Sequence, residues 1–275
     1  MKTYLIIAAL LMAAPVQAAP RRIVSLNPCL DTTLVQLADR DQIGALSHWA
    51  HDPTETTIYD MAKDLPITSE TAEEVILFEP DLVLTSRHSS LATRNALARV
   101  RIQTELFSEP QTVVESIEQV RRIAHLVGHD DRGEAMVARI EQALADAAPP
   151  PDARPISAII FQRFGFSTGA RSLVGEMITR TGFVNVAARY GLKSWGYLSL
   201  ESIIADPPEA LLAGAIDPNR PLWSDRMLRH PALAVVGPRM RRITFPDVLL
   251  SCGGPVLIQA AQVLSAGRRS ITEAP

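Results

Sequence analysis

The sequence has no surplus of positive charge, because 27 Lys and Arg stand against 30 Asp and Glu for a formal net charge of −3. A general nucleic-acid-binding protein normally carries a basic surplus, so we expect no nucleic-acid partner. Beyond residues 1–18 the sequence also lacks any apolar run long enough to span a membrane. What remains is the composition of a globular protein, and 275 residues suffice for one large domain or two lobes.

The one apolar run stands at residues 1–18, MKTYLIIAALLMAAPVQA. Lys2 precedes an apolar stretch that ends in the small-residue pattern before Ala18, which is typical of a secretory signal peptide. The alternative is a membrane anchor, but the stretch is too short to cross a bilayer comfortably. We therefore expect export, cleavage after Ala18 and a mature protein in the periplasm.

Strand and helix patterns alternate along most of the chain. In the first half the pattern predicts strands at 21–26, 43–47, 81–86 and 102–107, and helices at 30–39, 72–79 and 91–100. Residues 112–148 show only helical periodicity, broken once near 128–131. Alternation then resumes over 156–162, 173–182, 199–206, 209–214, 242–247 and 256–267. Such alternation implies parallel sheets with helices on both faces.

The order of these segments predicts an α/β protein of two Rossmann-like lobes joined by one long backbone helix. We place the N-terminal lobe at 19–128, the backbone helix at 129–150 and the C-terminal lobe at 151–275. Ligands of open parallel sheets bind at the carboxyl ends of the strands, so we expect a ligand cleft between the lobes. A single helical connection predicts a stiff hinge.

One helix–strand phrase occurs twice, as TAEEVILFEPDLVLTS and as LSLESIIADPPEALLAG. Thr71 and Ser199 are favourable N-cap residues, and Thr71-x-x-Glu74 has the form of a capping box. Glu73 and Glu201 occupy the same slot after these caps. Each carboxylate could simply complement its helix dipole. Two of them in matching positions also suggest acidic groups, one per lobe, that dock onto basic residues of a symmetric partner.

The mature chain resembles the periplasmic substrate-binding proteins of ABC importers for iron–siderophore complexes, haem and cobalamin, the group with a helical backbone. The resemblance rests on RRIVSLNPCLDTTLVQLA, TAEEVILFEPDLVL, FQRFGFSTGARSLVGEMI, WGYLSLESIIADPPEALL and the closing helix. In that family one Glu per lobe pairs with arginines of the membrane permease, and Glu73 and Glu201 fall on those positions. The resemblance implies a monomeric, non-enzymatic carrier of a metal chelate, without a cofactor of its own, that docks on an inner-membrane ABC permease.

Aromatic residues make up only 5% of the chain, and several of them stand in Gly- and Ser-rich connections at strand ends. Such positions suit the grip of a flat or bulky organic ligand, although they also suit ordinary core aromatics. Arg87 follows a strand and could meet an acidic group of the cargo. The candidate ligand-binding residues are His48, Trp49, Arg87, His88, Phe164, Trp195, Tyr197 and Cys252.

Two other functions have a signal in the sequence. GFSTG at 165–169 fits the G-x-S-x-G elbow of a secreted serine hydrolase, with Ser167 as nucleophile and His230 as a later partner. The helix begins too far downstream for an elbow, however, and no oxyanion-loop motif precedes it. His48, His51 and His88 could instead hold a bare transition metal if the fold brought them together, since such a site gathers three or four ligands.

Cys29 and Cys252 each follow a predicted strand, one in each lobe. Two cysteines in an exported chain normally suggest a disulfide. Here a bridge would staple two lobes that must admit cargo between them, so we expect unpaired thiols rather than a disulfide. Ligation of a metal-bearing cargo is the third alternative.

Overall fold

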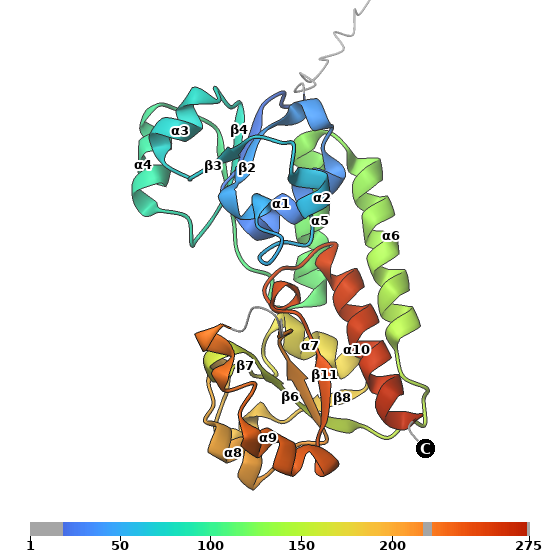
Figure 1. The fold of residues 1–275 in the computed structure, drawn as a ribbon. Coiled ribbons are helices and arrows are strands. Elements are labelled where there is room, and N and C mark those ends of the chain that lie inside the picture. Colours follow the sequence, from blue (N-terminus) through green and yellow to red (C-terminus); the bar gives the residue numbers. More distant parts are fainter. Residues whose placement is uncertain (1–18, 217–221, 274–275) are drawn as a thin grey trace, which may run out of the picture.

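The computed structural model describes residues 19–216 and 222–273. The predicted signal peptide at 1–18 lies outside the described residues. Two α/β lobes are stacked along the long axis of the molecule, the N-terminal lobe above the C-terminal lobe in Figure 1. Within the described part of the chain, no helix combines the length and apolarity that a membrane crossing requires.

The N-terminal lobe is built on a five-stranded sheet in the order β3-β2-β1-β4-β5, and every pairing is parallel. Its strands are β1 (Ile23–Ser25), β2 (Ile43–Ser47), β3 (Ile67–Thr68), β4 (Leu82–Ser86) and β5 (Thr104–Phe107). Its helices are α1 (Pro28–Leu37), α2 (Tyr59–Ala62), α3 (Ala72–Leu77), α4 (Leu91–Arg99) and α5 (Val113–Val127).

Neighbouring residues of these strands enter different cores, as the two-residue period of a strand requires. Ile23 and Leu82 pack with α1 and α5, whereas Val24 and Val83 pack with Val75 of α3 on the other face. Helices therefore cover both faces of the sheet (Figure 1). This explains why all five residues of β4 are buried and why its sequence reads as an almost continuous apolar run.

The C-terminal lobe repeats this plan with one strand fewer. Its parallel sheet has the order β11-β10-β6-β8, and a separate antiparallel ribbon pairs β7 with β9. The strands are β6 (Ile156–Phe161), β7 (Phe166–Thr168), β8 (Phe183–Asn185), β9 (Trp195–Tyr197), β10 (Ala210–Ala213) and β11 (Arg241–Thr244). The helices are α7 (Leu173–Arg180), α8 (Leu200–Ala205), α9 (Pro231–Val236) and α10 (Val256–Thr272).

The repeated phrase occupies the same place in both lobes. Helix α3 leads into β4 beside the central strand β1, and α8 leads into β10 beside the central strand β6. Both N-caps form, because Thr71 Oγ1 accepts from the Glu74 N–H at 3.3 Å and Ser199 Oγ accepts from the Ser202 N–H at 3.2 Å.

The predicted capping box at Thr71 is only half present. The Glu74 carboxylate accepts from the backbone N–H of Ser69 at 2.6 Å and from the hydroxyl of Thr68 at 3.0 Å. It is therefore committed to the segment just before the cap. The box fails because this segment folds back on the helix, helped by Glu70, whose φ is 66°.

The lobes are joined by helices that run beside one another. Helix α6 (Asp130–Ala147) lies within the range 129–150 in which the sequence predicts a backbone helix. It packs along α5 and α10, and Figure 1 shows α6 and α10 descending side by side from one lobe to the other. At Gly133 a side chain would collide with Ala124 of α5, so this glycine permits the close approach of α5 and α6. One core cluster runs from α1 through α5, α6 and α10 to α7.

Candidate ligand cleft

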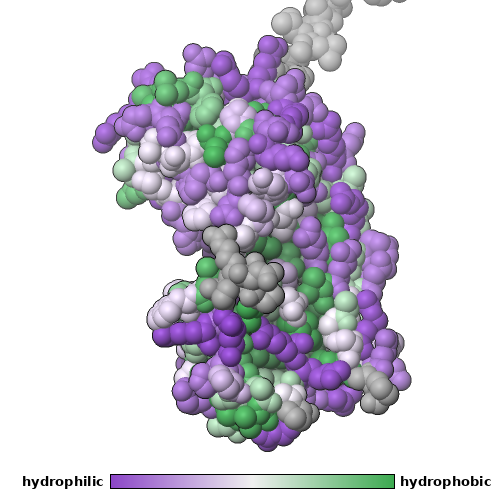
Figure 2. Space-filling model, viewed as in Figure 1, coloured by the Kyte–Doolittle hydropathy of each residue, from purple (hydrophilic) through white to green (hydrophobic). Residues whose placement is uncertain are grey.

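A cavity of about 550 Å³ lies between the lobes. It is lined by residues that follow the carboxyl ends of strands in both sheets, such as Asn27 after β1, His88 after β4 and Gln162 after β6. Figure 2 shows the surface hollowed between the lobes. The size lies within the range of small-molecule sites, and the position is the expected one for parallel sheets.

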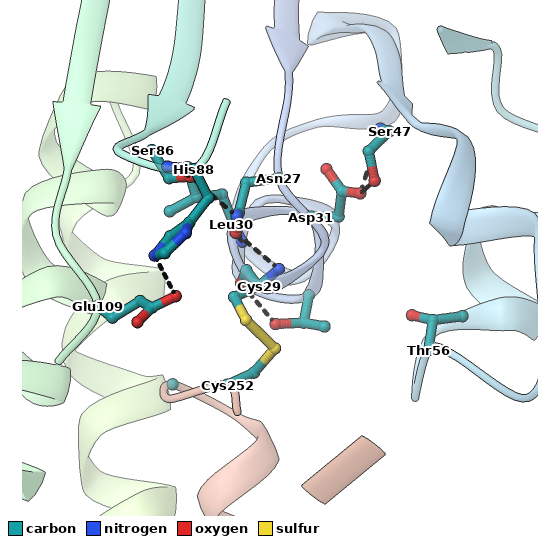
Figure 3. Close-up of a disulfide and its surroundings, with 12 residues drawn as sticks. Asn27, Cys29, Leu30, Asp31, Ser47, Thr56, Ser86, His88, Glu109 and Cys252 are labelled. Carbon is teal, nitrogen blue, oxygen red and sulfur yellow. Dashed lines mark hydrogen bonds and ion pairs between the residues drawn. A yellow bond between two sulfur atoms is a disulfide. The ribbon is translucent and has the colours of Figure 1, made fainter. Parts of the chain in front are cut away.

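Asn27 organises the N-terminal wall. Its Oδ1 accepts from the backbone N–H groups of Cys29 at 2.9 Å and Leu30 at 3.2 Å, so it caps α1. Its Nδ2 donates to Ser86 Oγ at 3.1 Å, which ties the end of β1 to the end of β4 (Figure 3). This side chain therefore holds two strand ends and the start of α1 in one rigid wall.

Trp49 supplies the aromatic surface of this wall and is 40% exposed. Its ring lies 4.4 Å from that of His48, and His48 Nδ1 lies 3.6 Å from a carboxylate oxygen of Glu70. Glu70 itself lines the cavity, and burial raises the pKa of its carboxyl group, partly offset by His48. His48 is exposed beside Trp49 and Glu70 and is not among the residues that line the cavity.

His88 lines the cavity from the loop after β4. Its Nε2 lies 2.9 Å from the Glu109 carboxylate, so the ring is held by an acidic neighbour (Figure 3). An imidazole beside a carboxylate can serve as a hydrogen-bonding or metal-binding group, because the partner fixes the orientation of the ring.

Arg163 and Asp247 dominate the C-terminal wall. Arg163 Nε donates to Asp225 Oδ1 at 3.0 Å, and its Nη1 lies 3.6 Å from Asp247 Oδ2. Asp225 is buried and also accepts from the Leu222 N–H. Burial raises the pKa of Asp247, while Arg163 opposes that shift. Among the described residues that line the cavity, Arg163 carries the one guanidinium, and this group is shared between two carboxylates.

A disulfide joins Cys29 and Cys252 at the floor of the cavity (Figure 3). Cys29 stands in the first turn of α1, and Cys252 precedes α10, with Cα atoms 4.9 Å apart. The expectation of unpaired thiols, and with it the alternative of thiolate ligation, is wrong. The bridge lies where Cys252 packs against the core cluster that both lobes share, just before α10 begins.

The structure brings together only some of the eight candidate ligand-binding residues. Trp49, His88 and Cys252 line the cavity, the last as a disulfide sulfur. His48 and Arg87 are both exposed and lie outside the lining. The remaining three belong to the C-terminal lobe and do not line the cavity, and they are exposed by 50% for Phe164, 70% for Trp195 and 68% for Tyr197.

One of these exposed aromatic residues, Tyr197, contacts a ring that lines the cavity. Phe166 lines the cavity and makes an edge-on contact with Tyr197 at 6.0 Å between ring centroids. Phe164 lies 5.9 Å from Trp223, a residue that sequence reasoning missed. Arg226 stacks over Trp223 at 3.7 Å from the ring centroid. No pattern around Trp223 distinguishes it from an ordinary loop aromatic.

Sequence reasoning also missed Gln162, Arg163 and Asp247 on the C-terminal wall. Each follows a strand, Gln162 directly after β6 and Asp247 shortly after β11. The rule that ligands meet strand carboxyl ends could have found them, because it applies equally to both lobes.

The geometry favours neither of the two alternative functions. Ser167 lies in β7, fully buried, and its hydroxyl has no hydrogen-bond partner among the described residues, whereas His230 caps α9 elsewhere. His51 Nε2 contacts the carbonyl oxygens of Ala62 and Leu65 at 3.1 and 3.0 Å. His48 and His88 instead lie beside Glu70 and Glu109, so the three histidines have different partners. No group of three or more His, Cys, Asp or Glu within the described ranges is placed to hold a metal ion.

Glu73 and Glu201 are both exposed in the first turns of α3 and α8. Neither carboxylate has an ion pair or hydrogen bond to any described residue. Helix α3 lies at the upper end and α8 at the lower end of the molecule, both away from α6 and α10 (Figure 1). A surface with one free carboxylate on each lobe is therefore available to a partner.

One family model and several known proteins are similar to this chain. A family model described as "Periplasmic binding protein" matches residues 23–236. A cobalamin-binding protein of Halobacterium salinarum is 26% identical over 74% of this chain and 56% of its own length, so the match spans little more than half of that relative. A vitamin B12-binding protein of Pectobacterium carotovorum is 23% identical over 92% of this chain and 90% of its own length.

Among solved structures, the periplasmic haem-binding protein RhuT of Roseiflexus sp. RS-1 is similar in fold. It has a TM-score of 0.72 at 24% identity and covers 91% of this chain and 98% of its own. This likeness shows that the two chains share a fold.

Proposed function

The chain belongs to the periplasmic binding protein family, and from this premise we propose that it captures a metal-chelate nutrient and delivers it to an ABC importer permease. The cargo is a ferric siderophore, haem or cobalamin, the chelates that the named relatives and the family resemblance suggest. The protein acts in the periplasm as a monomer and performs no reaction on its cargo.

The observation that carries this proposal is the cavity of about 550 Å³ between the lobes. It combines an aromatic surface at Trp49 and Phe166 with polar groups at His88 and Arg163. A mostly organic ligand with a few polar substituents fits such a lining. The buried Ser167 and the absence of a partner for its hydroxyl among the described residues speak against hydrolysis.

The docking part of the proposal rests on Glu73 and Glu201. Proteins of this family generally work with ABC importer permeases. One exposed carboxylate on each lobe, in matching helices, suits a permease that presents a basic residue to each lobe. Such pairs direct docking even where each is weak on its own.

Native mass spectrometry tests the cargo. The protein is purified from its own periplasm without denaturation, and the mass of the bound molecule is read directly. We expect one chelate per chain, released on unfolding. If the protein carries nothing, and if cobalamin, haemin and ferric siderophores each fail to bind in titration calorimetry, the proposed function is wrong.

A further inference from the structure

The charged residues that line the cavity are mostly acidic. Glu55 and Glu70 line it from the N-terminal lobe, and Asp247 lines it from the C-terminal lobe. Among the described lining residues, Arg163 and His88 are the basic groups. Glu55 is exposed, and the side chains of Glu70 and Asp247 keep 20% and 35% of their surface exposed. Acidic side chains on both walls are therefore open to a bound cargo.

Both basic groups already have acidic partners. Arg163 Nε donates to Asp225 Oδ1 at 3.0 Å, and its Nη1 lies 3.6 Å from Asp247 Oδ2. His88 Nε2 lies 2.9 Å from the carboxylate of Glu109. Asp225 and Glu109 stand outside the lining, so they neutralise these groups from behind the cavity surface. Neither basic group is left over to balance an anionic group of the cargo.

The N-terminus of α1 also lines the cavity but offers no donors to an anion. The positive end of a helix binds anions through its free backbone N–H groups. Here Pro28 has no N–H, and Asn27 Oδ1 accepts from the N–H groups of Cys29 and Leu30. The Asp31 N–H donates to the Asn27 carbonyl at 3.0 Å. Residues 28–31, all within the described part of the chain, therefore have no free N–H.

Glu55 is a carboxylate without a counter-charge of its own. It forms no ion pair or hydrogen bond through its side chain with any described residue. Burial raises the pKa of Glu55, as do the carboxylates of Asp52 and Asp247, while Arg163 opposes the shift. Because Asp247 and Arg163 belong to the other lobe, Glu55 faces the C-terminal wall across the cavity.

The aromatic part of the lining favours the same sign of charge. Trp49 lies in the N-terminal wall and Phe166 in the C-terminal wall. The face of an aromatic ring carries negative potential, so it attracts cations and not anions. The rings and the carboxylates therefore favour the same class of ligand.

We propose that the cavity selects its cargo by charge and takes a neutral or cationic chelate, with an ammonium or amide group placed near Glu55 and Glu70. An anionic periphery is disfavoured because it adds like charge and finds no free cation. This inference rests on the proposed function. Among the candidate cargoes it favours cobalamin or a siderophore with an ammonium group over haem, which bears carboxylates, and over anionic siderophores.

The test changes one kind of terminal group on each candidate chelate. The starting compounds carry carboxylates and are haemin, a cobalamin with one peripheral amide hydrolysed, and succinylated ferrioxamine B. Coupling to ethylenediamine replaces each carboxylate by an ammonium group, and coupling to propylamine gives a neutral group of similar size. For whichever chelate binds, we expect affinity to rise from carboxylate through propylamide to ammonium, by about tenfold in total.

Titration calorimetry measures these constants at low salt and again in about 0.5 M NaCl, where screening should reduce the preference. Glu55→Gln and Glu70→Gln should each weaken the preference for the ammonium form. Glu55→Lys should reverse it, so that the carboxylate form binds more tightly. Glu118→Lys is the matched control, because Glu118 is exposed on α5 outside the cavity lining and should keep the wild-type preference. Melting temperatures check that each variant is folded.

The other outcomes overturn the inference in distinguishable ways. If a chelate binds to the wild type and its carboxylate form is as tight as its ammonium form, the inference is wrong while the proposed function stands. A preference for ammonium that survives unchanged in Glu55→Lys and Glu70→Gln would show that these carboxylates do not set it, which also overturns the inference. If no chelate binds in any form, both the inference and the proposed function fail.

Discussion

Cys29 and Cys252 are bonded across a sequence separation of 223 residues, and the bond lies at the floor of the cavity between the lobes. Closing so long a loop restricts the unfolded chain, which in the chain-entropy model stabilises the native state by about 2–5 kcal/mol. The double variant Cys29→Ser/Cys252→Ser should therefore unfold at a clearly lower denaturant concentration than the oxidised wild type.

The control for this prediction is reductant. It should lower the stability of the wild type to near that of the double variant and leave the variant unchanged. Equal unfolding midpoints for oxidised wild type and double variant would show that the bond contributes no stability.

We expect the buried carboxyl group of Asp31 to make the free energy of unfolding depend on pH. Its carboxyl group is fully buried beneath the N-terminal wall, and burial raises its pKa from 3.8 to about 8, against the opposing hydrogen bonds from Ser25 and Ser47. The unfolded chain releases this proton near its ordinary pKa, whereas the native state retains it. Stability from this group is therefore present at low pH and is lost as pH rises toward 8, by about 1.4 kcal/mol per pH unit.

Asp31→Asn should flatten this dependence, because its amide does not titrate. Urea unfolding at several pH values between 5 and 8 measures the slope for both proteins. The exposed Asp152→Asn variant should keep the wild-type slope. The same slope in wild type and Asp31→Asn would mean that Asp31 is ionised in the native protein.

Variants of Trp49 and Trp195 distinguish cargo binding in the cavity from cargo binding on the exposed β7–β9 ribbon. Trp49 lines the cavity, whereas Trp195 is 70% exposed on the β7–β9 ribbon. Trp49→Ala should weaken chelate binding about tenfold or more, since it removes most of an aromatic wall. Trp195→Ala should change affinity by less. Titration calorimetry gives both constants, and a larger loss at Trp195 would place the cargo on the ribbon instead.

Glu73→Ala and Glu201→Ala test docking. Both carboxylates are exposed and form no ion pair or hydrogen bond with any described residue, so the free energy of unfolding of each variant should stay within about 1 kcal/mol of the wild type. Each variant should also bind chelate normally. Transport into cells or vesicles and permease-stimulated ATP hydrolysis should fall, most in the double variant, because truncating a desolvated interface pair costs about 2–5 kcal/mol. Undiminished transport in the double variant would exclude docking through these residues.

The two lobes and their parallel sheets could be predicted because the signals are local. Strands such as β4 and β10 are buried on both faces and read as apolar runs, and α3 and α8 begin at side-chain caps that the sequence spells out. The short strands β3, β7, β8 and β9 gave no such signal. Trp195 and Tyr197 of β9 are exposed, so their pattern is that of a loop.

The candidate site was harder to predict, because its residues meet only when the lobes face one another. His88 and Trp49 stand out as unusual residue types at strand ends, whereas Gln162 and Asp247 resemble any polar loop residues. The disulfide was missed because the argument against it assumed that Cys29 and Cys252 face each other across an open cleft. They lie instead beside the core cluster that both lobes share, where their Cα atoms are 4.9 Å apart.

The core cluster that passes from α1 through α5, α6 and α10 to α7 contains buried residues of both lobes, so we expect the lobes to unfold cooperatively. Neither lobe can melt alone without exposing apolar faces of α6 and α10 that the other lobe helps to cover. Calorimetry of the cargo-free protein should accordingly show a single transition in which both sheets are lost together. An excised lobe would expose that helical surface, so we expect it to be less stable than the same lobe in the whole chain.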